Sequence, residues 1–128
     1  MRMSFKLLCL FLTVAATAVF GETGEIAGKW RAEFDTMIGV QRYLFEFKVE
    51  GEKVSGTATG ERSGDKTTVS ISEGRWCGGQ LTFVEPLKFE GMDLRIAYRG
   101  QLTASGQLKL TRVVSDFATE ELVAERTK

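Results

Sequence analysis

The chain has 128 residues, equal numbers of basic and acidic side chains, and no histidine. Without histidine it cannot assemble a Ser-His-Asp or Cys-His nucleophile system, and it lacks the commonest ligand of transition metals. It also contains no run of lysine or arginine that would neutralise phosphates, so we expect no nucleic-acid partner.

The first 21 residues follow the plan of a secretory signal peptide. The basic residues Arg2 and Lys6 precede an apolar run from Leu7 to Phe20. This run has fourteen residues, short of the roughly 20 that a membrane-spanning helix needs, so we expect cleavage rather than a retained anchor. We place the cleavage site after Gly21, with Ala18 as the alternative.

Cleavage would leave residues 22–128 as one secreted domain, periplasmic or extracellular, with a net charge near −2. Because Cys9 lies in the signal, Cys77 would be the single cysteine of that domain and could form no internal disulfide. Cys77 is then a small residue at a strand end, a thiol that forms an intermolecular bridge, or a reactive thiol.

Alternating apolar and polar residues predict β-strands along the whole domain. The clearest strands are 29–34, 42–50 and 92–99. Tight turns separate the strands and leave no room for crossover helices, so neighbouring strands should pair antiparallel. These turns lie at Gly39, Gly51-Glu52, Ser63-Gly64-Asp65, Gly78-Gly79, Gly91 and Ser105-Gly106.

The later strands contain two irregular features. Pro86 lies inside the fifth strand and should mark a bulge or an edge, because proline cannot donate to the ladder. The seventh strand is predicted over 107–114 and the eighth over 119–127. Between them, 115–121 has a second interpretation in which Asp116 caps a short helix.

Eight strands in meander order leave two outer edges, and pairing the first strand with the last removes both. We therefore predict an all-β fold, an eight-stranded antiparallel up-and-down meander closed into a small barrel. Such a barrel is filled by side chains or holds one small ligand, and so many inward aromatic residues favour a full interior. The residues predicted to face inward are Trp30, Phe34, Phe45, Phe47, Val69, Ile71, Leu81, Phe83, Leu94, Ile96, Leu108 and Leu110.

The segment Ile26-Ala27-Gly28-Lys29-Trp30 opens the first strand with a Gly-x-Trp motif, and it resembles the start of lipocalins and related calycin barrels. The resemblance implies that Trp30 plugs the closed end of the barrel and that an arginine near the last strand packs across its ring. Arg126 would take this role because the eighth strand should run antiparallel to the first. Arg112 is the other candidate. The disulfides and middle motifs of lipocalins are not evident.

A second resemblance, to an uncharacterised small β-module of environmental bacteria, extends over nearly the whole mature chain and rests on four stretches spread along it. They are Gly28-Lys29-Trp30, Phe34–Gln41, Phe89–Met92 and Asp116–Val123. That module occurs alone or beside secreted hydrolases, including glycoside hydrolases. It brings no catalytic residues, so the resemblance implies location and class only.

We expect a non-catalytic binding or accessory domain with no catalytic residue, cofactor or metal. The expected ligand is a carbohydrate, a small apolar molecule or another secreted protein, with no membrane contact after signal cleavage. Candidate contact residues are Arg75 and Trp76, which precede the Gly78-Gly79 turn, and Tyr98. Trp76 has an alternative role, in which it covers an end of the barrel instead of stacking on a sugar.

Two further functions stay open. One is an inhibitor of periplasmic enzymes, which would block its target with the arm 22–27 or with a protruding loop. The other is a glycoside hydrolase or its accessory module, because such enzymes need only two carboxylates about 5 to 9.5 Å apart. The candidate acids are Glu85, Glu90 and Asp93, which could meet at the barrel mouth.

Overall fold

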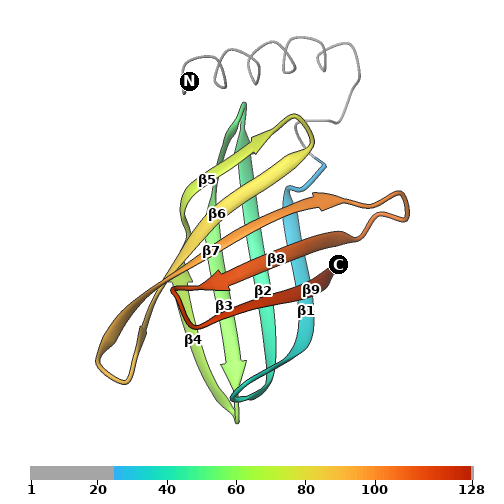
Figure 1. The fold of residues 1–128 in the computed structure, drawn as a ribbon. Coiled ribbons are helices and arrows are strands. Elements are labelled where there is room, and N and C mark those ends of the chain that lie inside the picture. The colour runs from blue at the N-terminus through green and yellow to red at the C-terminus, as the bar shows by residue number, and fades with distance from the viewer. Residues whose placement is uncertain (1–24, 128) are drawn as a thin grey trace.

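A computed structural model describes residues 25–127, and all of the regular structure in this range is β-strand (Figure 1). The strands are β1 Gly28–Thr36, β2 Gly39–Glu50, β3 Lys53–Arg62, β4 Asp65–Ser70, β5 Ser72–Cys77, β6 Gln80–Phe89, β7 Met92–Leu102, β8 Leu108–Val114 and β9 Ala118–Arg126. The described range has no helix of the length and apolarity that crossing a bilayer requires. The prediction of an all-β domain is confirmed, whereas the predicted signal lies outside the described residues.

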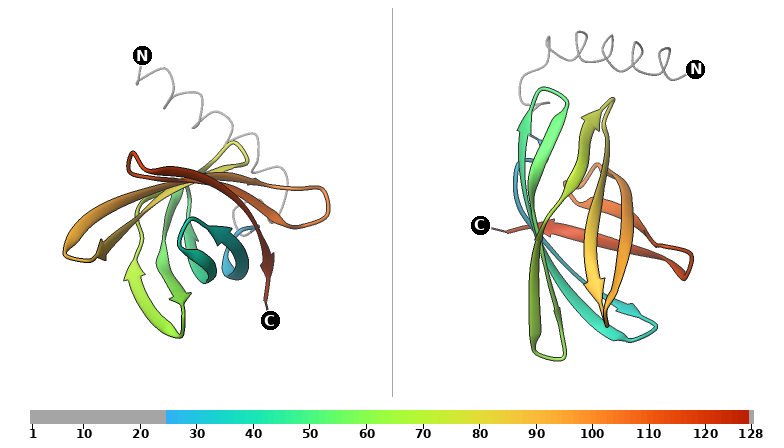
Figure 2. Two further views of the ribbon diagram at one scale, coloured as in Figure 1. Left: turned by 60° about the horizontal axis from the view of Figure 1, so that its bottom comes forward. Right: turned by 90° about the vertical axis from the view of Figure 1, so that its left-hand side faces the viewer.

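The strands form one closed antiparallel barrel (Figure 2). The sheet order is β2-β1-β9-β8-β7-β6-β5-β3-β4, and an additional pairing of β2 with β3 closes the ring. The first and last strands meet where Trp30 pairs with Arg126 and Arg31 pairs with Glu125. The predicted eight-stranded meander is therefore confirmed, with β4 as one extra short strand.

The extra strand exists because the predicted fourth strand is broken at Ile71. Before Ile71, β4 pairs with β3, and after it, β5 pairs with β6. The pairing of β5 with β6 shifts register between Ser72 and Arg75, and Glu73 in this stretch has a φ of 55°. Such a bulge bends a strand, and here it lets β4 turn away from β6.

The divergence of β4 from β6 leaves an opening in the barrel wall, which we call the lateral gap. It is visible in Figure 2 as the separation of the β3–β4 hairpin from the β6–β7 hairpin. Beyond Val84, β6 pairs with β7 alone. Pro86 lies in this stretch, where the strand has a neighbour on one side only. The prediction that Pro86 marks a bulge or an edge is confirmed, and the feature is an edge.

Aromatic side chains fill the middle of the barrel. The rings of Phe45, Phe47, Phe83 and Tyr98 meet at centroid distances of 4.4 to 5.9 Å, some stacked and some edge to face. Such contacts add roughly 0.5–1.5 kcal/mol per pair to the stabilisation from burial. Packing is therefore dense here, as the sequence predicted.

Most of the residues predicted to face inward are buried, but Val69 and Leu94 are only half-buried. Val69 lies on β4, which flanks the lateral gap, and Leu94 lines a pocket at one end of the barrel. Both side chains lie on the face of their strand that alternation predicts to be inward. They are incompletely covered because the barrel is open at these two places.

Trp30 closes one end of the barrel together with Ile26, and both side chains are fully buried. The Trp30 indole N–H donates a 2.9 Å hydrogen bond to the Ile26 carbonyl. The Arg126 guanidinium lies 4.3 Å from the Trp30 ring centroid and donates to the carbonyls of Glu25 and Ala27. Arg126 therefore packs across Trp30 as predicted, and this cation–π contact contributes roughly 0.5–2 kcal/mol of stabilisation.

The connection between β8 and β9 is a turn, so the interpretation with Asp116 as a helix cap is wrong. Ser115 has a φ of 47°, and the Phe117 N–H donates to the Val114 carbonyl at 2.8 Å. These features reverse the chain directly into β9, which begins at Ala118.

Cys77 ends β5 and is half-buried. It is disulfide-bonded, and the part of the chain that the structure describes contains no free cysteine. The expectation that Cys77 forms no internal disulfide applies to the domain after cleavage of residues 1–21, and it stays a prediction. Cys9, the second cysteine of the sequence, lies outside the described residues.

The close approach of β2 and β3 at Gly56 can be tested by substitution. A Cβ at Gly56, where φ is 142°, would lie 1.8 Å from the Glu46 carbonyl oxygen, whereas a Cβ at Gly51, where φ is 62°, meets nothing within 4 Å. Gly51→Ala should lower the free energy of unfolding by about 1–2 kcal/mol through backbone strain. Gly56→Ala should lower it by more, because the two strands must also separate. Denaturant unfolding measures both, and equal losses would contradict this account.

Candidate functional site

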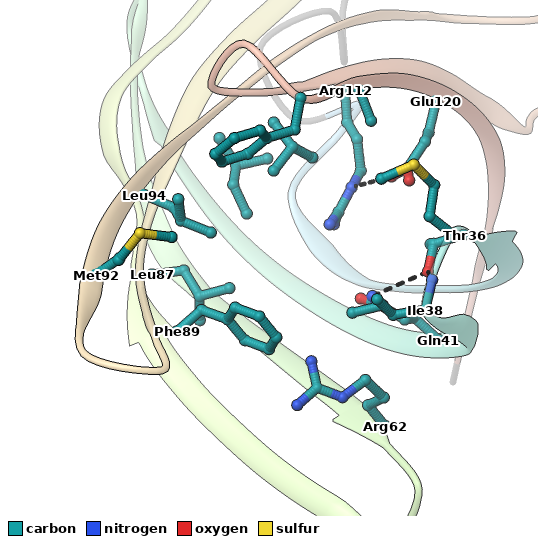
Figure 3. A pocket seen from close by; sticks show the side chains of 15 residues that line it. Thr36, Ile38, Gln41, Arg62, Leu87, Phe89, Met92, Leu94, Arg112 and Glu120 are labelled. Carbon is teal, nitrogen blue, oxygen red and sulfur yellow. Dashed lines mark hydrogen bonds and ion pairs between the residues drawn. The ribbon is translucent and has the colours of Figure 1, made fainter.

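The end of the barrel opposite Trp30 is open and contains an apolar pocket of about 180 Å³, which we call the open-end pocket (Figure 3). Its walls come from the β1–β2 and β8–β9 turns and from the adjacent ends of β6, β7 and β8. The apolar walls include Leu87, Phe89, Leu94, Ile96 and Val114, and the polar lining residues are Thr36, Gln41, Arg62, Arg112 and Glu120.

The rim of the open-end pocket exposes large apolar side chains. Met37 is 78% exposed, Phe117 59%, Ile38 52% and Met92 49%. They come from three separate connections, β1–β2, β6–β7 and β8–β9, and the fold brings them together around one opening. Contiguous exposed apolar surface on a folded domain marks a site of ligand or protein contact. The two methionines suit such a site because their side chains adapt to partners of different shape.

A buried polar network lies between the open-end pocket and the aromatic core. Glu85 accepts hydrogen bonds from the hydroxyls of Tyr98 at 2.7 Å and Tyr43 at 2.8 Å. Arg112 donates from Nη1 to the Tyr98 hydroxyl and from Nε to Glu120, both at 2.8 Å. The ion pair between Arg112 Nη1 and Glu85 Oε1 is longer, at 3.9 Å. We call these five residues the buried network.

Aromatic rings surround the guanidinium of Arg112, whose Cζ atom lies 5.1 Å from the ring centroid of Tyr43, 5.2 Å from Phe34 and 5.7 Å from Tyr98. Arg112 is 3% exposed and Glu85 is 2% exposed. No buried side-chain nitrogen or oxygen lacks a hydrogen-bond partner within residues 25–127. This complete pairing is what makes a buried charge tolerable, because an unpaired one would be severely destabilising.

Burial determines the ionisation of the buried network. It raises the pKa of Glu85, while hydrogen bonds from Tyr98 and Tyr43 and the charge of Arg112 lower this pKa by less. Burial, together with the charge of Glu85, raises the pKa of Tyr43 to about 12 and that of Tyr98 well above 10. Burial alone would lower the pKa of Arg112, but the oxygens of Tyr98, Tyr43 and Glu85 raise it overall. The phenols therefore stay protonated as donors, and Arg112 stays charged.

Strand alternation explains why these polar side chains point inward. Glu85 is two residues beyond Phe83 on β6, and Arg112 is two residues beyond Leu110 on β8, so each continues a buried face. Only the phase of the alternation indicates that Glu85 is buried, whereas we expected this acid at the barrel mouth.

Gly60 on β3 makes room for the ring of Tyr43, its partner on β2. A Cβ at Gly60 would lie 2.9 Å from Cζ of the Tyr43 ring. The position of the Tyr43 hydroxyl against Glu85 therefore depends on a residue without a side chain in the neighbouring strand.

A second and more polar pocket, of about 210 Å³, occupies the lateral gap. Arg62 and Phe89 line both pockets, and the Arg62 guanidinium lies 4.6 Å from the Phe89 ring centroid. This stack joins the end of β3 to the end of β6 and lies on the boundary of the two pockets. The lateral gap is also lined by Tyr43, Glu61, Asp65, Thr67, Glu85 and Glu90.

The three predicted contact residues do not form one site. Trp76 is 6% exposed and belongs to the hydrophobic core, so it offers no surface for stacking on a sugar. Its alternative role, as a core residue near the end of the barrel, is the one that the structure has. Arg75 lies on the same strand and contacts Glu52 at 3.4 Å. Tyr98 is inside the barrel as part of the buried network.

Of the three acids proposed for glycoside hydrolysis, Glu85 and Glu90 line the lateral gap, and Asp93 does not. Glu85 is buried and bonded to both tyrosines, whereas Glu90 and Asp93 are exposed on the β6–β7 hairpin. Asp93 faces Lys88 at 3.6 Å.

Arg112 was considered only as an alternative partner for Trp30, and the structure gives it a different role, at the centre of the buried network. No cluster of three or more cysteine, aspartate or glutamate side chains suited to a metal ion occurs among the residues described. Comparisons with family models, with curated proteins and with solved structures found no match to this chain.

The ionisation of the phenols is directly measurable, because Tyr43 and Tyr98 are the two tyrosines of the sequence. In the folded protein no phenolate should form near pH 10, Tyr43 should ionise at about pH 12, and Tyr98 should ionise later or only on unfolding. In denaturant both should titrate near pH 10. Ultraviolet absorbance follows the phenolate, and a native signal near pH 10 would contradict the buried network.

The raised pKa of Glu85 predicts an unusual dependence of stability on pH. The folded protein holds the Glu85 proton more tightly than the unfolded chain does, so this group's contribution is greatest below about pH 4.5 and is lost as the pH rises through the raised pKa. The free energy of unfolding of the wild type relative to Glu85→Gln should therefore fall as the pH rises above about 4.5. Glu121→Gln, on an exposed position of β9, controls for loss of a carboxylate. A rise with pH would refute the prediction.

Proposed function

We propose that the protein is a non-catalytic binding domain whose site is the open-end pocket. The observation that carries this proposal is an apolar pocket ringed by exposed Met37, Ile38, Met92 and Phe117. Leaving these side chains in water is unfavourable, at roughly 25 cal/mol for each Å² of apolar surface, and a ligand that covers them recovers this free energy.

The size of the pocket selects among the expected ligand classes. An apolar cavity of about 150 Å³ holds one benzene molecule, so the 180 Å³ pocket suits a group of about six to eight carbon atoms. A small apolar ligand therefore fits better than an extended polysaccharide. The burial of Trp76 also removes the aromatic platform on which carbohydrate binding was expected to depend.

The buried network favours binding over catalysis. The hydrogen bonds of Glu85 are directed to Tyr43 and Tyr98, and Arg112 is held by Glu120 and Tyr98. These groups pair with one another, so the buried network forms a rigid polar floor beneath the pocket, and its charges are already neutralised within it. A rigid floor beneath an adaptable apolar rim is suited to holding a ligand in place.

A protein partner is the second candidate, because Met37 and Ile38 form an exposed apolar tip on the β1–β2 hairpin. A hairpin tip of this kind can enter the cleft of another protein, as an enzyme inhibitor would require. The two candidates differ in their dependence on the pocket interior, since a small ligand needs the space behind the rim and a docking hairpin does not.

Export is a further part of the proposal, and it depends on residues 1–21, which lie outside the described range. Cleavage within this segment would separate Cys9 from the domain that carries Cys77. Intact mass and thiol labelling of the exported protein would therefore give both the cleavage site and the state of Cys77.

Filling the pocket tests the proposed function. Ala118 lines the open-end pocket, whereas Val123 is an exposed residue of the same strand, 44% accessible. Nuclear magnetic resonance titration with 1-octanol should show shifts at the pocket residues of the wild type. Ala118→Trp should weaken this binding by about tenfold or more, because the indole occupies the pocket. Val123→Trp, the matched control, should bind like the wild type.

The outcome also separates the two candidates. Absence of any octanol shift at the pocket residues of the wild type would refute the small-ligand function. Recovery of a stoichiometric protein partner from a periplasmic extract, retained by Ala118→Trp but lost in Met37→Ser with Ile38→Ser, would favour the docking hairpin.

A further inference from the structure

We propose that the ligand of the open-end pocket is an amphipathic anion whose charged group is bound by Arg62. This inference rests on the proposed function and adds the chemical class of the ligand. It follows from the charges that line the pocket, from how each is paired, and from the charges in the adjoining lateral gap.

The charged side chains that line the open-end pocket are Arg62, Arg112 and Glu120. Arg112 and Glu120 neutralise each other through a 2.8 Å ion pair, and Arg112 also faces Glu85. Arg62 makes no ion pair with any of residues 25–127, and its guanidinium stacks on the ring of Phe89. The unmatched charge in this apolar pocket is therefore positive.

The position of Arg62 suits a ligand with an apolar body and a charged end. Figure 3 shows Arg62 beside Phe89, across the pocket from the Arg112–Glu120 pair. A ligand body lying against Phe89 and Leu87 would place its charged end within reach of Arg62. Stacking occupies one face of the guanidinium and leaves its N–H edge available, and this edge matches the two oxygens of a carboxylate.

The lateral gap determines from which side an anion can reach Arg62. Its lining includes Glu61, Asp65 and Glu90, none of which forms an ion pair within the described part of the chain. These carboxylates would repel an anion that approached from the lateral gap. The open end, with its apolar rim, is therefore the side from which the ligand binds.

Three ligands of equal chain length test the inference: octanoate, 1-octanol and octylammonium, each titrated by nuclear magnetic resonance near neutral pH. One charge-assisted hydrogen bond is sufficient for octanoate to bind about tenfold more tightly than octanol. Octylammonium should bind most weakly. The preference for octanoate should shrink as salt is added, because Arg62 is partly exposed to solvent.

Substitution of Arg62 identifies the group responsible. Arg62→Gln should reduce octanoate binding to the level of octanol without changing octanol binding. Arg62→Lys should retain part of the preference, because the charge remains while the bidentate edge is lost. Arg99→Gln removes a more exposed positive charge, on β7, that does not line the pocket, and it should leave all three affinities unchanged.

The possible results separate the inference from the function on which it rests. If octanol binds and octanoate binds no better, or if octylammonium binds best, the anion inference is wrong while the apolar binding function stands. If none of the three binds, the proposed function itself fails. Should Arg62→Gln not fold, the ranking and salt dependence of the three ligands on the wild type still decide the question.

Discussion

A buried guanidinium connects the parts of this barrel. The members of the buried network come from β2 and from the four consecutive strands β6, β7, β8 and β9, so it joins the N-terminal half of the barrel to the C-terminal half. Removing one member of a buried ion pair is far more destabilising than the net contribution of the pair, because the remaining charge is left without a partner. The strands are therefore held in one register by polar contacts as well as by packing.

The buried network also divides the interior. On one side, stacked aromatic rings and the Trp30–Arg126 contact fill the barrel to its closed end. On the other side lies the open-end pocket, where the strands end in hairpins. Dense packing on one side makes the network a rigid floor, and the apolar rim on the other side accounts for the binding function that we propose.

The break in the fourth strand has a separate consequence. The bulge between Ser72 and Arg75 turns β4 outward, and the exposed ion pair between Glu73 and Arg95, with N–O distances of 2.6 and 2.8 Å, fixes the bulge against β7. At the resulting lateral gap, β6 has an exposed edge that contains Pro86, which cannot donate a backbone hydrogen bond to another strand. Acidic side chains line the gap. An edge of this kind resists pairing with another chain, and the acids give the lateral gap a negative charge, opposite in sign to the unmatched Arg62 of the open-end pocket.

Strand alternation and turn residues determined the class, the strand order and most of the core, because a period of two and short turns admit only antiparallel neighbours. They also placed Trp30 near Arg126, since an even number of strands makes the first and last antiparallel. The site was decided by the tertiary structure. The phase of alternation directs Glu85 and Arg112 inward, but the hydrogen bonds that join Glu85 to its two phenol donors are contacts between strands that no local pattern encodes. The rim of Met37, Met92 and Phe117 likewise forms only when three separate turns converge at one opening.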